Sequence, residues 1–268
     1  MTEARMQESP EYAPGTFCWF ELGTTDNEGA KKFYTTLFGW SVEDHPMGPA
    51  GVYTMLKQDG KDVGALYRMP SEMTDHGVPT HWMSYVLVAS ADESATKAKE
   101  LGATLMKEPF DVMDVGRMAV VQDPTGAMFA LWEAKAHTGA SLVNVPNSVC
   151  WNELATPDTE KAGDFYTGLF GWSKNVQQMG PMTYTSFMNG DRPAGGMYTP
   201  PPEMGEMPPN WLVYFAVNDT DAMVAKAAEL GATTCAPPMD IPGIGRFAVL
   251  QDPQGGAFAV IKLASTPA

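Results

Sequence analysis

Apolar and polar residues alternate with changing periods along the chain, and the order of these periods predicts its elements. Residues Phe17 to Leu22 alternate as a strand does. Asp26 then offers an N-terminal cap to a helix whose apolar residues recur at helical spacing and which ends at Gly39. Three short strands are predicted next, between Gly-Pro and Asp-Gly turns: Ser41 to Asp44, Val52 to Leu56 and Val63 to Tyr67.

The same order begins again after a connector rich in Met and Pro, residues Met69 to Thr80. A strand is predicted at Trp82 to Val88 and a helix at Asp92 to Leu101. Three further strands are expected near Thr104 to Phe110, Met118 to Gln122 and Met128 to Glu133. This stretch of the chain therefore contains two βαβββ modules.

The second half of the chain repeats the first. Cys18-Trp19-Phe20-Glu21-Leu22 recurs 132 positions later as Cys150-Trp151-Asn152-Glu153-Leu154. The helix ending Leu37-Phe38-Gly39-Trp40 recurs as Leu169-Phe170-Gly171-Trp172. Gly116-Arg117 recurs 129 positions later as Gly245-Arg246. Because this period is the size of a domain, we predict a first domain at residues 15–134, a linker at 135–147 and a second domain at 148–264.

The charge balance is strongly acidic and narrows the range of partners. The chain carries 17 Lys and Arg against 32 Asp and Glu, a formal net charge of −15. This charge repels nucleic-acid phosphates and anionic lipid, so we expect neither nucleic acid nor a membrane as a partner. Its apolar runs are shorter than the roughly 18 residues of a membrane span, and residues 1–14 do not resemble a secretory signal. We expect a cytoplasmic protein whose three cysteines are free packing residues: Cys18, Cys150 and Cys235.

Four βαβββ modules, a helix ending Phe-Tyr-x-x-Leu-Phe-Gly-Trp and a closing Asp-Pro-x-Gly turn resemble the vicinal oxygen chelate superfamily. This superfamily includes glyoxalase I, bleomycin-resistance proteins and extradiol dioxygenases, and the resemblance covers nearly all of residues 15–264. It implies an α+β fold in which the four modules form two tandem glyoxalase-like domains. Paired modules of this superfamily curl into a sheet-lined cup, where the enzymes hold a divalent metal with His or Glu.

The residues at the superfamily's metal-ligand positions mostly cannot bind a metal. The first-strand His position falls on Trp19 and Trp151, whose indoles are not metal ligands. Only Glu133 occupies a ligand position, with His81 displaced from another, and the duplicate of Glu133 is Lys262. A divalent ion needs about three protein ligands. We therefore expect no cofactor; a divalent metal, if bound, would use Glu133 and His81.

The resemblance also predicts which side chains line the two cups. The first cup is expected to contain Trp19, Glu21, His81, Met83, Tyr85, Phe129, Leu131 and Glu133. The second is expected to contain Trp151, Glu153, Asn210, Leu212, Tyr214, Phe258, Val260 and Lys262. Apolar walls with a few polar groups suit small flat organic molecules. Because Glu133 makes the first cup acidic where Lys262 adds a cation to the second, we expect one dominant ligand site, in the first cup.

Several functions are compatible with this pattern. The leading hypothesis is a protein that binds a small aromatic or conjugated molecule without a metal, as the bleomycin-resistance proteins do. The alternatives are a metal-independent enzyme using Glu21 and Glu153 as acid or base, a divalent-metal lyase like glyoxalase I, a dioxygenase, or a regulatory interaction protein. Structural roles are also open: Trp19 and Trp151 as core, His81 as a surface residue, and Glu21 and Glu153 as partners of Arg117 and Arg246.

Overall fold

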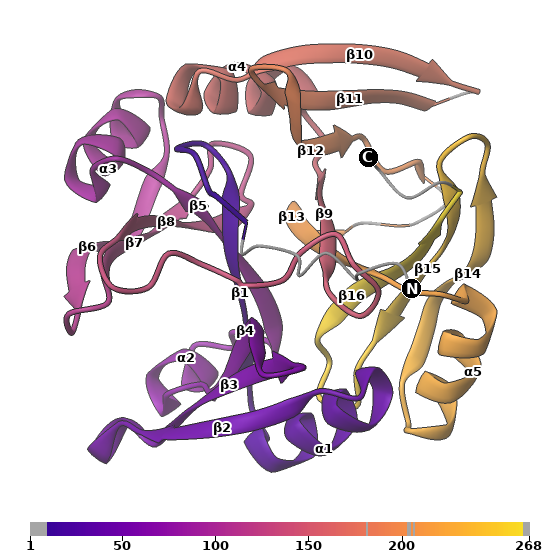
Figure 1. Ribbon diagram of the computed structural model, residues 1–268. Coiled ribbons are helices and arrows are strands. Elements are labelled where there is room, and N and C mark those ends of the chain that lie inside the picture. The colour runs from indigo at the N-terminus through magenta and orange to yellow at the C-terminus, as the bar shows by residue number, and fades with distance from the viewer. Residues whose placement is uncertain (1–9, 181, 203–204, 206, 265–268) are drawn as a thin grey trace, which may run out of the picture.

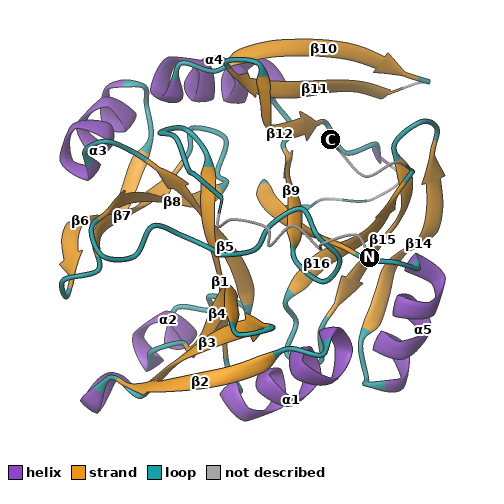
Figure 2. Ribbon diagram, in the orientation of Figure 1, coloured by secondary structure: helices purple, strands orange, loops and turns teal. Residues whose placement is uncertain are grey.

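The computed structural model describes residues 10–180, 182–202, 205 and 207–264, which form two eight-stranded sheets with helices beside them (Figures 1 and 2). The first sheet and its helices are β1 (Phe17–Thr24), α1 (Asn27–Phe38), β2 (Ser41–Pro46), β3 (Val52–Gln58), β4 (Lys61–Arg68), α2 (Ser71–Asp75), β5 (His81–Leu87), α3 (Ala91–Glu100), β6 (Thr104–Val112), β7 (Gly116–Gln122) and β8 (Met128–Ala134). The second sheet and its helices are β9 (Val149–Ala155), α4 (Thr159–Phe170), β10 (Ser173–Met179), β11 (Met182–Asn189), β12 (Arg192–Tyr198), β13 (Asn210–Ala216), α5 (Thr220–Glu229), β14 (Thr233–Ile241), β15 (Gly245–Gln251) and β16 (Ala257–Leu263).

The two modules of each sheet meet at their opening strands. The strand order is β2-β3-β4-β1-β5-β8-β7-β6 in the first sheet and β10-β11-β12-β9-β13-β16-β15-β14 in the second. β1 pairs antiparallel with β5, and each of them pairs in parallel with the last strand of its own module. This arrangement confirms the predicted α+β fold of four βαβββ modules.

Local sequence determines where the first helix of each domain begins and ends. Asp26 caps α1 by accepting a hydrogen bond from the Gly29 amide at 3.1 Å, and Asp158 caps α4 in the same way. Both helices end at a glycine in the left-handed region, Gly39 at φ 76° and Gly171 at φ 73°, where other residues are strained. Among the described helices, none is long and apolar enough to cross a bilayer.

The first helix of each domain packs on the sheet of the other domain. Tyr34 of α1 lies edge-on to Phe258 of β16, with ring centroids 5.6 Å apart. Tyr166 of α4 packs against Phe129 of β8 at 5.5 Å. α1 also lies beside α5, and α4 beside α3 (Figure 1). One face of each sheet is therefore buried between the domains, which leaves the opposite face to line a cup.

Candidate functional site

The central strands β1 and β5 bring four of the expected side chains onto one face of the first sheet. In their antiparallel register Trp19 lies opposite Tyr85 and Glu21 opposite Met83. Because alternate residues of a strand share a face, all four side chains point to the same side. We call this face, away from the domain interface, the first cup.

Glu21 is the centre of a hydrogen-bonded cluster in the first cup. The Tyr53 hydroxyl donates to its carboxylate at 2.8 Å, and the Tyr85 hydroxyl donates to the other carboxylate oxygen. The Trp19 indole N–H in turn donates to the Tyr53 hydroxyl at 3.0 Å. Burial, and to a smaller extent the nearby Glu21 charge, raises the pKa of the Tyr67 hydroxyl, so Tyr67 also lies close to the carboxylate. One carboxyl group is thus surrounded by three tyrosines and an indole.

Burial sets the acidity of Glu21. Desolvation raises the pKa of the carboxyl above its usual range, and the hydrogen bonds from Tyr85 and Tyr53 oppose part of this rise. Burial and the neighbouring carboxylate likewise raise the pKa of Tyr53 and Tyr85. The cluster therefore favours its protonated forms more than the same groups do in water.

The second sheet builds the same cluster around Glu153. The Tyr214 hydroxyl donates to its carboxylate at 2.6 Å, and the Trp151 indole N–H donates to the Tyr184 hydroxyl at 2.9 Å. Tyr184 lies beside Glu153, and burial together with the Glu153 charge raises the pKa of Tyr184 and that of Tyr198, the latter to about 12. Burial raises the pKa of Glu153 as well, again partly opposed by the two tyrosine hydrogen bonds. We call this face of the second sheet the second cup.

Four of these tyrosines were not predicted from the sequence. Tyr53 and Tyr67 lie on β3 and β4 of the first sheet, and Tyr184 and Tyr198 lie on β11 and β12 of the second. The signal that could have identified them is the repeat itself, because each pair recurs at an offset of 131 positions. They reach the glutamates only because β4 and β12 pair in parallel beside β1 and β9.

The two cups differ in how far they open to solvent. Trp19 is 4% exposed and Glu21 is 9% exposed, whereas Trp151 and Glu153 are half-buried. The difference arises from the segment between the domains: the His137 ring lies edge-on against Trp19 at 4.3 Å. Over the described part of the chain, Trp151 makes no such ring contact. The first cup is therefore covered, and the second is the more accessible.

The covering segment crosses the first cup from one side to the other. Its backbone amides at Lys135 and His137 donate to the Val115 carbonyl, next to β7. The Ala140 amide then donates to the Cys18 carbonyl of β1 at 2.7 Å, and the Ser141 amide donates to the Asp62 carbonyl of β4 at 2.7 Å. We call residues 135–141 the strap.

The prediction that Glu133 and Lys262 close the two cups is wrong. Tyr85 lies opposite Ala130 in the parallel register of β5 and β8, so Ala130 and Trp132 share its face and Glu133 points the other way. The Glu133 carboxylate accepts a hydrogen bond from the Ala91 amide at 2.9 Å, where α3 begins. Lys262 is likewise on the helix side and exposed.

The same inversion applies to the other residues predicted on the closing strands. Phe129 and Phe258 lie between the domains rather than in the cups, and Leu131 and Val260 share their faces. The electrostatic difference expected between the cups is therefore absent. The preference for the first cup rested on that difference and no longer has a basis.

The alternative that Arg117 and Arg246 pair with the two glutamates is also wrong. The Arg117 guanidinium binds Asp92 at 2.7 Å, and that of Arg246 binds Asp221 at 2.6 Å. Asp92 lies in the first turn of α3 and Asp221 in the first turn of α5. Each ion pair holds a helix against the face of its sheet that lies opposite the cup.

His81 and Asn210 begin the strands β5 and β13 at equivalent positions. The His81 ring nitrogen Nδ1 lies 2.8 Å from the Pro79 carbonyl, and Asn210 donates to the Pro208 carbonyl at 2.9 Å. Burial lowers the pKa of His81, which favours its neutral form. Both side chains bond to the connector just before their strand, and within the described residues neither hydrogen-bonds to the glutamates of the cups.

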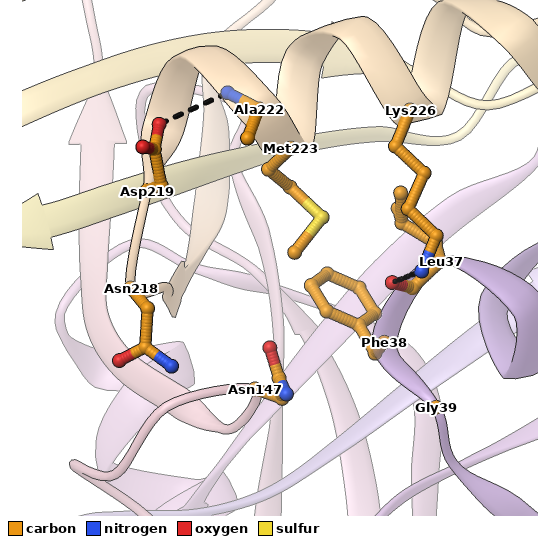
Figure 3. A pocket seen from close by; sticks show the side chains of 9 residues that line it. All are labelled: Leu37, Phe38, Gly39, Asn147, Asn218, Asp219, Ala222, Met223 and Lys226. Atoms are coloured by element: carbon orange, nitrogen blue, oxygen red, sulfur yellow. Dashed lines mark hydrogen bonds between the residues drawn. The ribbon is translucent and has the colours of Figure 1, made fainter.

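A groove between the domains lies apart from both cups (Figure 3). Its volume is about 320 Å³, and it runs between the end of α1 and the start of α5. The Lys226 ammonium crosses it to donate to the Leu37 carbonyl at 2.9 Å, at the C-terminal end of α1. Its lining residues are Leu37, Phe38, Gly39, Asn147, Asn218, Asp219, Ala222, Met223 and Lys226.

Comparison with known proteins identifies the family of this chain. The sequence profile of the Glyoxalase/Bleomycin resistance protein/Dioxygenase superfamily matches residues 16–131 and again residues 146–260. The chain belongs to this superfamily. Each match coincides with one of the two eight-stranded sheets. This member of the glyoxalase superfamily is therefore a tandem of two glyoxalase-like domains.

Two curated members of the superfamily match over almost their whole length. A Mycobacterium tuberculosis protein named "Putative glyoxylase CFP32" is 43% identical over 259 residues, which is 96% of this chain and 98% of the relative. The "Anthracycline biosynthesis protein DnrV" of Streptomyces peucetius is 37% identical over 265 residues, 94% of each chain.

Solved structures of the glyoxalase superfamily share the fold at low sequence identity. The Mn(II)-bound glyoxalase of Novosphingobium aromaticivorans is 16% identical with a TM-score of 0.62, covering 95% of this chain and 86% of its own. The 2,2',3-trihydroxybiphenyl 1,2-dioxygenase of Sphingomonas wittichii is 13% identical with a TM-score of 0.63, covering 93% and 91%. This likeness concerns the fold alone.

The residues of this superfamily member do not fit a divalent metal. Among the described residues, no group of three or more His, Cys, Asp or Glu side chains gathers around a common point. Glu133 and His81, the two candidate ligands, lie on opposite faces of the first sheet: His81 shares the face of Tyr85 on β5, whereas Glu133 on β8 is an odd number of positions from Ala130, the residue paired with Tyr85. The carboxyl at the centre of each cup accepts a hydrogen bond from a tyrosine hydroxyl, and a single carboxyl falls short of the about three protein ligands that a divalent ion needs.

Proposed function

We propose that the protein binds a flat, conjugated organic molecule in its second cup and that no metal takes part. The observation that carries the proposal is the half-buried pair Trp151 and Glu153 in a cup whose counterpart is covered by the strap. An indole that is neither packed as core nor fully exposed offers a face on which a ring can stack. We infer that this cup is the working site.

The surroundings of Trp151 support a small-molecule ligand. Tyr214, Ala259 and Ile261 form a separate small apolar cluster, against which Trp151, Leu212 and Phe247 pack while partly exposed. Apolar walls provide affinity, and the Glu153 carboxyl with its tyrosines provides a few directional hydrogen bonds. The name of the Streptomyces peucetius relative, which places that protein in anthracycline biosynthesis, agrees with a small organic ligand.

A second candidate function is metal-independent acid–base catalysis by Glu153 on the bound molecule. The observation that favours it is the raised pKa of Glu153, since a carboxyl that titrates nearer to neutral pH can both take up and release a proton. The tyrosine hydroxyls of Tyr184 and Tyr214 would hold the carboxylate in place during such a transfer. Glu21 has the same partners but lies beneath the strap.

Titration of flat aromatic compounds tests the proposal through intrinsic fluorescence. We expect quenching in the wild type, its loss in Trp151→Ala, and its retention in Trp19→Ala, with circular dichroism confirming that both variants fold. Wild-type binding by both variants would exclude both cups. Turnover of a bound compound that disappears in Glu153→Gln, while binding persists, would establish the catalytic candidate.

A further inference from the structure

Among the residues that the structure describes, the Glu153 carboxyl has no cationic partner. The Tyr214 hydroxyl donates to it and Tyr184 lies beside it, and over the described ranges no Lys, Arg or His forms an ion pair with it. The cup-facing residues of β13, β15 and β16 carry no positive charge: Leu212, Tyr214, Phe247, Val249, Ala259, Ile261 and Leu263. An ionised carboxylate in this place is therefore uncompensated.

Aromatic rings surround this carboxyl on several sides. The Trp151 indole N–H donates to the Tyr184 hydroxyl, and the Tyr214 hydroxyl donates to the Glu153 carboxylate. Tyr198 lies near enough that the carboxylate charge, after burial, raises the pKa of its hydroxyl. The ring of Phe247 lies 6.2 Å from that of Tyr214. The faces of aromatic rings attract cations, most strongly where water is excluded, and groups of such rings bind quaternary ammonium ions in other proteins.

We infer that the second cup selects organic cations: flat conjugated molecules that carry a positive charge on nitrogen. This inference rests on the function proposed above and adds the charge class of the ligand. The ligand's charge would compensate the Glu153 carboxylate, and the rings of Trp151 and Tyr184 would stabilise the same charge through their faces. An anionic ligand would meet an unpaired carboxylate of its own sign.

Three probes of similar size and different charge test this inference on the full chain. N-methylquinolinium is permanently cationic, quinoline is neutral at pH 7.5, and 2-naphthoate is anionic. We expect N-methylquinolinium to bind the wild type about tenfold more tightly than quinoline, as a desolvated cation–π contact with a carboxylate predicts. We expect no saturable binding of 2-naphthoate.

Two variants assign this selectivity to Glu153. In Glu153→Gln we expect the ratio of cation to neutral affinity to fall severalfold toward one, the remainder coming from the aromatic rings, with quinoline affinity within roughly twofold of wild type, because the amide keeps the shape and loses the charge. Glu160→Gln removes the same charge from an exposed position of α4 and should leave the ratio unchanged.

The outcomes separate the inference from the proposed function. Equal or weaker binding of the cation in the wild type, with quinoline binding that depends on Trp151, overturns the cation inference and leaves the proposed function standing. A ratio that survives Glu153→Gln also overturns it. Failure of all three probes to bind counts against both.

Discussion

Tyr34 of the first domain donates a hydrogen bond to the carboxylate of Asp252 in the second domain, 2.8 Å away across 218 positions of sequence. Tyr166 makes the reciprocal bond to Asp123, also at 2.8 Å. Each tyrosine hydroxyl in turn accepts the indole N–H of its own domain's tryptophan, Trp82 or Trp211. The two Asp-Pro turns that close the repeat are thus held by the helix of the other domain.

Tyr34→Phe is expected to destabilise the whole chain rather than one domain. It removes a buried hydrogen bond to a carboxylate and leaves the Trp82 N–H without its acceptor, a loss of about 2 kcal/mol in the free energy of unfolding. Urea denaturation followed by circular dichroism measures it. Tyr198→Phe is the control, because its hydroxyl donates to no protein group in the described ranges, and a cost as large as that of Tyr34→Phe would contradict the role of the interdomain bond.

Glu21→Gln should stabilise the protein at neutral pH and have little effect in acid. Burial raises the pKa of Glu21 in the folded state above its value in the unfolded chain. A carboxyl of this kind contributes stability below the unfolded pKa, and that stability is lost as pH rises through the folded pKa, by about 1.4 kcal/mol for each unit of difference. Denaturation of wild type and variant at pH 4 and pH 8 measures the difference, and a variant less stable than wild type at pH 8 would contradict the prediction.

Gly196→Ala should disturb the second cup through Tyr184. A Cβ atom at this position of β12 overlaps the hydroxyl and ring of Tyr184, whereas the equivalent position of the first sheet is occupied by Ala65. We expect a cost of about 1–3 kcal/mol, as for other overpacked sites. In a double-mutant cycle with Tyr184→Ala most of this cost should vanish, and full additivity of the two substitutions would refute the contact.

His137→Ala should uncover Trp19. The ring of His137 packs against this indole, and its Nε2 atom is buried without a hydrogen-bond partner, so little besides packing holds it there. We expect acrylamide to quench a larger fraction of the tryptophan fluorescence than in the wild type. His45→Ala, at an exposed ring on β2, should not change the fraction; equal quenching in the two variants would show that the strap does not shield the first cup.

The metal prediction is tested on the purified protein. Because Trp19 and Trp151 occupy ligand positions of the superfamily and the described residues gather no ligand cluster, we expect less than stoichiometric Mn, Fe, Ni or Zn after dialysis. Elemental analysis gives the content directly. One tightly held divalent ion per chain would overturn the expectation, and loss of that ion in Glu133→Ala would identify its site.

The sequence by itself determined the modules, the duplication and the face of the opening strands. Phe17 to Leu22 and Trp82 to Val88 could be placed because capped helices and glycine ends follow them at fixed distances, and these signals are local. Alternation along β1 and β5 was then enough to put Glu21 and Tyr85 on one side, since the antiparallel register keeps their phase.

Only the tertiary structure decided what surrounds the two glutamates and which of them solvent reaches. β8 is buried on both faces, so its sequence carries no alternation from which the side of Glu133 could be assigned. Tyr53 and Tyr184 reach the glutamates through the parallel pairing of strands some 30 positions away, and the strap covers Trp19 by folding back across the sheet. These contacts join residues distant in sequence, and their positions follow from the packing of two whole domains rather than from any local preference.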